Sequence, residues 1–269
     1  MKIQSFGNIH QHLDLIAGLP YENYKSFENS FNDVYSIRPE KLQLGFLKLL
    51  KGSGLRMKEK EYNFKYLDKP PYEILENSYI SYSDIIKFKG IEDLVEKYYN
   101  EGYFLHSLEF IIRNNYTSPF KFYEEFSMYW EECQLYLILL DYFRFRKFEY
   151  EDIFTELLKL DYICNNSKQN LPTGIIRSVN NLSQANLHLL LKNSELIAEY
   201  LTEYKDVPTK QIVNKIIVEE FDYDVFKTIN NEYKPYKVKN PVYLLFKYNQ
   251  TNMNRYETYN ITNYVREMI

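Results

Sequence analysis

The chain has 269 residues, with 33 Lys and Arg against 37 Asp and Glu, a net charge of −4 and only two cysteines. This length allows one large or two modest domains with a substantial core. The acidic balance argues against a nucleic-acid partner, and the longest apolar run, at 135–140, is too short to span a membrane. The N-terminal residues lack the apolar core of a signal peptide, and two cysteines fit a reducing compartment. We therefore expect a cytoplasmic protein without nucleic-acid or membrane partners.

The first element along the chain is a strand over residues 9–17, which ends in a Gly-Leu-Pro turn at 18–20. Residue alternation gives this strand an apolar face that can pack under helices. The other face carries His10, His12, Asp14 and Ile16. Two imidazoles and a carboxylate are costly to bury, so we expect this face to line a wet or functional lumen. Such an asymmetry is typical of a strand in an α/β barrel.

A helix and a second buried strand follow. Phe27, Phe31 and Tyr35 recur at helical spacing, and residues 42–47 form the strand, on which Gln43 and Gly45 face the lumen. Strand, helix and strand make one parallel βαβ unit. Because a single unit leaves its sheet edges open, we expect self-association through the unpaired strand or an apolar barrel face.

The rest of the chain is predicted to be helical, after a hinge over 51–73. Helices are expected over 81–98, 103–114, from Pro119 onward, over 151–164 and over 183–204. The pattern then changes to short runs of aromatic and β-branched residues at 218–226, 242–248 and 256–262. These runs predict a small antiparallel sheet. The fold class is therefore mainly α with a small β component.

Several stretches carry a resemblance to a known family. HLDLIAGLPYE at 12–22 and LQLGFLKLLKGSGL at 42–55 resemble the last two strands of a radical S-adenosylmethionine (radical SAM) barrel. More narrowly, the chain is similar to proteins that join a cobalamin-binding domain, a radical SAM barrel and a helical C-terminal domain of unknown function. The stretches that resemble this last domain are PPYEIL at 70–75, LEFIIR at 108–113, LLKLDYICNNSKQNLP at 157–172 and VYLLFKY at 242–248. The division expected is a barrel piece over 1–60, a helical domain over 61–216 and short antiparallel strands over 217–269.

The resemblance also implies a cofactor site. In the family, the strand that ends in the Gly-Leu-Pro turn runs beside S-adenosylmethionine, which assigns Ile16, Ala17 and Gly18 to the cofactor wall. Asp14 and Gln43 join this wall from the lumen side. From spacing alone, Gly18 equally fits an ordinary strand-to-helix turn, and Asp14 fits a carboxylate paired with a neighbouring strand.

The chain departs from the family at the metal cluster. Radical SAM chemistry needs a four-iron cluster held by three cysteines, spaced Cys-x3-Cys-x2-Cys, whereas this chain has only Cys133 and Cys164. We therefore expect no cofactor and no catalysis from this chain alone. By resemblance, the complete protein uses S-adenosylmethionine and a 4Fe-4S cluster, with the role of cobalamin open. A separate polypeptide would supply the cluster-binding half. The alternative is a free-standing helical binding module without catalysis.

Other candidate sites are weak. His10 and His12 share a strand face and could point at one metal, but no third ligand has a matching spacing, so no metal site is expected. His106 and His188 lie in apolar helical runs and fit structural or surface roles. A hydrolase that uses His12 and Asp14 is a third class, although the chain has no Gly-x-Ser-x-Gly motif.

Overall fold

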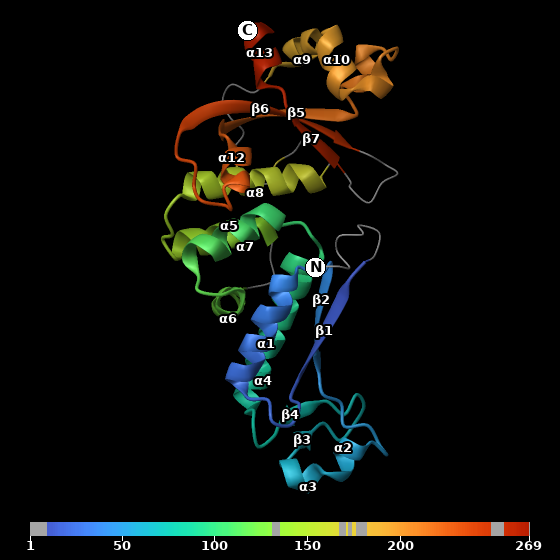
Figure 1. The fold of residues 1–269 in the computed structure, drawn as a ribbon, viewed down its shortest axis with the longest axis vertical. Helices are drawn as coiled ribbons and strands as arrows, with labels where there is room; N and C mark the ends of the chain where they lie inside the picture. Colours follow the sequence, from blue (N-terminus) through green and yellow to red (C-terminus); the bar gives the residue numbers. More distant parts are fainter. Residues whose placement is uncertain are drawn as a thin grey trace. The chain divides into compact units, whose positions relative to one another are not determined.

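The computed structural model describes residues 10–130, 135–166, 171, 174–175, 182–248 and 256–268. The chain is mainly helical with small sheets, as expected (Figure 1). It divides into two compact units, Met1–Gly102 with Asn115–Glu132, and Tyr103–Asn114 with Cys133–Ile269. The boundaries expected after residues 60 and 216 stay predictions. In the described part of the chain, no helix is long and apolar enough to cross a bilayer.

The first unit begins with the predicted βαβ arrangement. β1 (His12–Ala17) pairs in parallel with β2 (Lys41–Phe46), and α1 (Tyr24–Ile37) connects them. The Asn23 side chain accepts a hydrogen bond from the Ser26 amide, and Ser26 reciprocates in a capping box that fixes where α1 begins. The prediction of two adjacent parallel strands is confirmed. Barrel closure does not follow from it, because the sheet has two strands among the described residues.

Aromatic side chains hold the helices of this unit together. α1, α4 (Tyr82–Leu94) and α6 (Pro119–Tyr129) pack against each other, and the Phe27 and Phe88 ring centroids lie 4.2 Å apart. Ser81 and Ser118 cap α4 and α6, as the sequence predicts. α1 and α4 lie on one side of the β1–β2 pair (Figure 1).

Two details of this unit differ from expectation. The predicted hinge contains α2 (Gly54–Met57), α3 (Glu59–Tyr62) and β3 (Lys65–Tyr66), which pairs with β4 (Ile74–Glu76). In addition, α4 leads into a π-helical turn, η2 (Val95–Asn100). In both segments the apolar residues do not recur at a clear helical or strand spacing, so the sequence did not predict these elements.

The second unit starts with three packed helices. They are α5 (Leu105–Asn115), α7 (Leu135–Phe145) and α8 (Glu151–Asn165). The Phe143 and Phe154 rings stack with their centroids 4.0 Å apart, which joins α7 to α8.

The predicted C-terminal sheet is confirmed. β5 (Ile216–Tyr223), β6 (Lys239–Tyr248) and β7 (Tyr256–Asn260) form an antiparallel sheet in the order β5-β6-β7. Two predicted strand ends are wrong. The side chain of Asp224 caps α12 (Val225–Asn230), and Thr262 begins α13 (Thr262–Met268).

The predicted helix over 183–204 is broken into shorter pieces. They are α9 (Gln184–Leu190), α10 (Ser194–Tyr200) and η3 (Thr202–Tyr204), and α11 (Thr209–Ile212) follows. The break has a local cause, because the Asn193 side chain accepts hydrogen bonds from the amides of Glu195 and Leu196 and starts a new helix.

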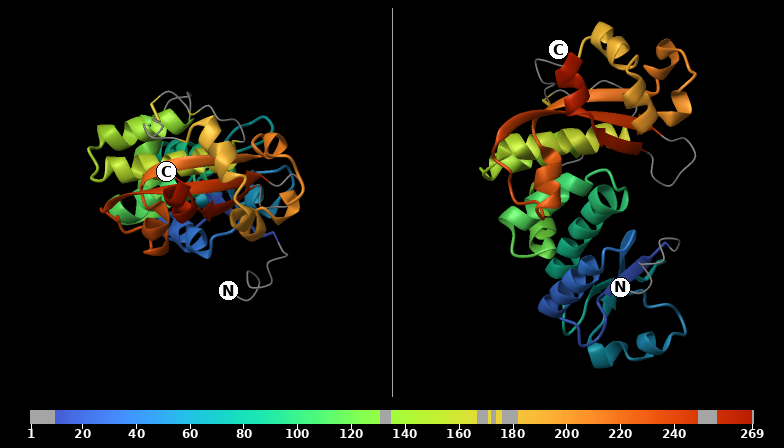
Figure 2. Two further views of the ribbon diagram at one scale, coloured as in Figure 1. Left: turned by 90° about the horizontal axis from the view of Figure 1, so that it is seen from above. Right: turned by 45° about the horizontal axis from the view of Figure 1, so that its top comes forward.

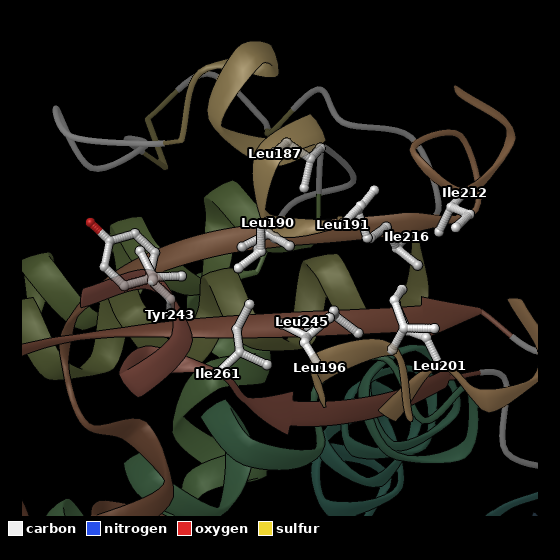
Figure 3. Close-up of a cluster of buried hydrophobic side chains, with 13 residues drawn as sticks. Leu187, Leu190, Leu191, Leu196, Leu201, Ile212, Ile216, Tyr243, Leu245 and Ile261 are labelled. Carbon is white, nitrogen blue, oxygen red and sulfur yellow. The ribbon is translucent and has the colours of Figure 1, made fainter. Parts of the chain in front are cut away.

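Helices cover both faces of the C-terminal sheet. α8 lies across one face, whereas α9, α10 and α13 lie on the other (Figures 1 and 2). On this second side, leucine and isoleucine side chains from α9 and α10 meet Leu245 of β6 and Ile261 in one buried cluster (Figure 3). The sheet is thus an internal layer of the second unit.

Candidate functional site

The β1–β2 pair has one buried and one exposed face. On the helix side, Leu42 is fully buried and Leu44 is 6% exposed. On the other side, Asp14 lies opposite Gln43, and both are exposed. Ile16, which is opposite Gly45, is 46% exposed. The polar face predicted from the sequence is therefore accessible.

The five residues predicted to form a cofactor wall do not all meet. Asp14, Ile16 and Gln43 share the exposed face, whereas Ala17 is buried on the helix side. Gly18 is also buried, with φ +91°, and a Cβ atom there would lie 2.8 Å from Cγ2 of Ile74. The absent side chain of Gly18 thus makes room for Ile74, and an aromatic ligand has no such gap to enter.

Among the described strands, only β2 pairs with β1, which leaves the outer edge of β1 unpaired in this part of the chain. The Lys41 amide donates to the Gln11 carbonyl at 3.1 Å, and the Leu47 amide donates to the Ala17 carbonyl at 2.9 Å. Backbone groups alternate in direction along a strand, so the N–H and C=O groups of His12, Asp14 and Ile16 point away from β2. No other described strand pairs with them.

A side chain caps the outer edge of β2 at Leu42. Oδ1 of Asn100 accepts the Leu42 amide at 2.9 Å, and Nδ2 of Asn100 donates to the Leu42 carbonyl at 3.0 Å. The Asn100 amide thus takes the place of a neighbouring strand. The π-helical turn η2 supplies this side chain, so a local irregularity of the helix protects the sheet edge.

The histidines and cysteines form no described metal centre. Among the described residues, no group of three His, Cys, Asp or Glu side chains could hold a metal ion. Nδ1 of His106 contacts the Tyr233 hydroxyl at 3.0 Å, and Nδ1 of His188 contacts Thr209 Oγ1 at 3.4 Å. Cys164 is buried, and desolvation raises the pKa of its thiol well above the ordinary value. Cys133 lies outside the described residues.

Two buried charged groups were missed by the sequence interpretation. Asp161 accepts hydrogen bonds from the His106 amide, and from the Ser107 amide and hydroxyl at 2.8 and 2.6 Å. It therefore caps the first turn of α5, although burial still raises the pKa of its carboxyl. An acid on the apolar face of α8, between Leu157 and Cys164, was the available signal.

The second buried group is Lys159, which is 1% exposed. Its ammonium donates to the Glu220 carbonyl at 2.8 Å and lies 3.4 Å from Glu156 and 3.8 Å from Glu219. Burial raises the pKa of Glu156 to about 7, although the attraction of Lys159 lowers it. These contacts tie α8 to β5, which is a structural role.

The second unit also has a cleft of 290 Å³ between α10, α13 and the end of β7. Carboxylates, tyrosines and asparagines line it: Glu195, Glu199, Tyr200, Asn260, Asn263, Tyr264 and Glu267. The Tyr264 hydroxyl donates to Glu199 at 2.5 Å. Such a cleft suits a cationic group.

Comparison with known protein families identifies the family to which this chain belongs. Residues 60–246, more than two thirds of the sequence, match the family described as Protein of unknown function (DUF4080). The chain belongs to the DUF4080 family. The matched segment begins after the β1–β2 pair and includes the helices from α4 to α12 and most of the C-terminal sheet. The DUF4080 region therefore accounts for the helical C-terminal part expected from the sequence. No curated protein matches the chain.

Proposed function

We propose that this DUF4080 protein is the C-terminal portion of a radical SAM enzyme. In this proposal, β1 and β2 are the last strands of an α/β barrel, and another polypeptide supplies the cluster-bearing strands. The chain alone is not catalytic.

One observation carries the proposal. Among the described residues, the outer edge of β2 is bonded by Asn100, whereas the outer edge of β1 has no partner strand. Parallel sheets are ordinarily covered on both faces and continued at their edges. Here β2 is closed by Asn100, while β1 keeps an open edge and an exposed polar face. An added strand beside β1 would continue the sheet, and curvature of the longer sheet into a barrel would turn the face with Asp14 and Gln43 toward an interior.

The residues of this chain suit S-adenosylmethionine better than they suit a four-iron cluster. Asp14, Ile16 and Gln43 are accessible and can contact S-adenosylmethionine, whereas Ile74 fills the space beside Gly18. A four-iron cluster does not fit this chain, because it needs three thiolates and the sequence has two cysteines, of which Cys164 is buried. We assign no residues to cobalamin. The thiolates of any cluster therefore lie outside these 269 residues.

Co-expression tests the proposal. The probe is the cluster-bearing half of a radical SAM protein that carries a DUF4080 region, produced anaerobically with this chain. We expect a stable 1:1 complex with iron–sulfur absorbance, and tighter S-adenosylmethionine binding than by the half alone.

A matched pair of variants assigns the contact to β1. Asp14→Pro removes an N–H that points away from β2 and should abolish the complex without unfolding the chain. Asp14→Asn keeps this N–H and should preserve the complex. Two polypeptides that stay separate would contradict the proposal. That result would favour the alternative, a free-standing binding module, for which the acidic cleft of the second unit is the first site to probe with cationic peptides.

A further inference from the structure

The β1 edge is incompletely covered as well as unpaired. On the helix-facing side, Leu13 and Leu15 of β1 are half-buried, whereas Leu42 and Leu44 at the same level of β2 are buried. The difference lies along the outer side of β1, whose main described neighbours are β2 and α1. A strand added there would satisfy backbone groups and cover apolar surface at the same time.

We propose that a second copy of this chain occupies this edge in solution, with the two β1 strands antiparallel across a two-fold axis. Only His12, Asp14 and Ile16 present outward N–H and C=O groups, so they set the allowed registers. If Asp14 faced the partner's Asp14, two carboxylates would lie directly opposite, which is unfavourable. A shift of two residues along one strand brings His12 opposite the partner's Asp14.

The shifted register is favourable on both faces of the joined sheet. On the exposed face, symmetry forms the pair of His12 with the partner's Asp14 twice. On the helix side, Leu13 lies at the two-fold axis and meets the partner's Leu13, which covers the half-buried leucines. Charge complementarity and apolar contact therefore select the same arrangement. The dimer does not depend on the radical SAM proposal, since it needs this chain alone.

Sedimentation velocity of the purified chain over a range of concentrations tests the dimer. The same buffer, at about pH 6, is used for every variant. Two charged residues lie near His12: Lys41, which is opposite it on β2, and Glu40. Both are left unchanged in every variant. We expect a monomer–dimer equilibrium. His12→Glu or Asp14→Lys alone should raise the dimer Kd about tenfold, because each removes two complementary pairs.

The double variant His12→Glu with Asp14→Lys restores complementary charges and should return the Kd to within about threefold of the original value. Gln43→Ala, an uncharged change on the same face but on β2, should leave the Kd unchanged. Asp14→Pro should give a monomer with unchanged circular dichroism. A monomer at every concentration would overturn the proposal, and so would a dimer that both single variants leave intact. Failure of the double variant to recover would overturn the register.

Discussion

The two main sheets of this molecule differ in how completely their own chain covers them. In β6, the neighbouring residues Leu244 and Leu245 point to opposite faces and both are 0% exposed. In β1, the neighbouring residues Ile16 and Ala17 are 46% and 1% exposed. Both faces of the C-terminal sheet are therefore covered within the chain, whereas one face of the parallel pair is exposed.

This difference in coverage indicates which sheet contributes most to stability and which one is available to a partner. The covered sheet lies within the second unit, where α8 and the cluster of Figure 3 take up both of its faces. The incomplete pair precedes the DUF4080 match and carries the polar residues Asp14 and Gln43. Surface that a chain leaves polar and unpaired is available for a partner, so the first unit is where we expect association.

The largest expected effect contrasts the two sheets directly. Phe246→Ala should lower the free energy of unfolding by about 3–5 kcal/mol, because the ring is fully buried in β6. Ile16→Ala on the exposed face of β1 should change it by less than about 0.5 kcal/mol. Urea unfolding followed by circular dichroism measures both. Equal losses would show that β1 is also covered.

The next largest loss of stability is expected at a glycine of the first unit. Gly18→Ala should cost about 2–4 kcal/mol, since an alanine would adopt positive φ and press on Ile74. Gly54→Ala is the matched control, because no atom lies within 4 Å of the added Cβ. Thermal unfolding compares the variants. A harmless Gly18→Ala would mean that the space beside Gly18 is open after all.

A buried carboxyl on α8, the helix that packs against β5, predicts that stability depends on pH. Burial raises the pKa of Glu156 to about 7 in the folded state, from 4.5 when unfolded. Between these values the folded state binds more protons, so stability falls as pH rises, by up to about 3 kcal/mol. Glu156→Gln should remove this slope, and the exposed Glu232→Gln should not. Urea midpoints at pH 4.5 and 7.5 give the answer, and parallel slopes for all three proteins would refute the assignment.

The smallest effect concerns the closed edge of β2. Asn100→Ala removes two hydrogen bonds to Leu42 and should cost about 1–2 kcal/mol. It should also expose a second strand edge and promote larger assemblies at high concentration. Asn263→Ala, at an exposed position of α13, serves as the control in unfolding and light scattering. A stable, monodisperse Asn100→Ala variant would mean that the amide does not protect the edge.

Much of the fold could be predicted because its signals are local. The alternation over β1, the spacing of Phe27 and Phe31 in α1 and the Ser118-Pro119 cap each act within a few residues. The break at Asn193 was missed because its amphipathic period continues across the cap. The π-helical turn was missed because its role, closing β2 with Asn100, depends on a contact 58 residues away.

The candidate site was predictable only in part for the same reason. Alternation alone groups Asp14 with Ile16 and places Ala17 on the other face. It cannot show that Ile74 occupies the space beside Gly18, which depends on how a later strand packs. Nor can it tell which of two strands keeps an open edge.

Amide hydrogen exchange of the dilute chain, read by NMR along β1, tests the central claim most directly. An open outer edge predicts alternation: the outward amides of Asp14 and Ile16 exchange quickly, while the amides of Leu13 and Leu15, which face β2, are protected. At high concentration, the amides of His12 and Asp14, which pair across the two-fold axis in the proposed register, should gain protection as dimers form. Slow exchange at all four positions in the dilute monomer would contradict the account.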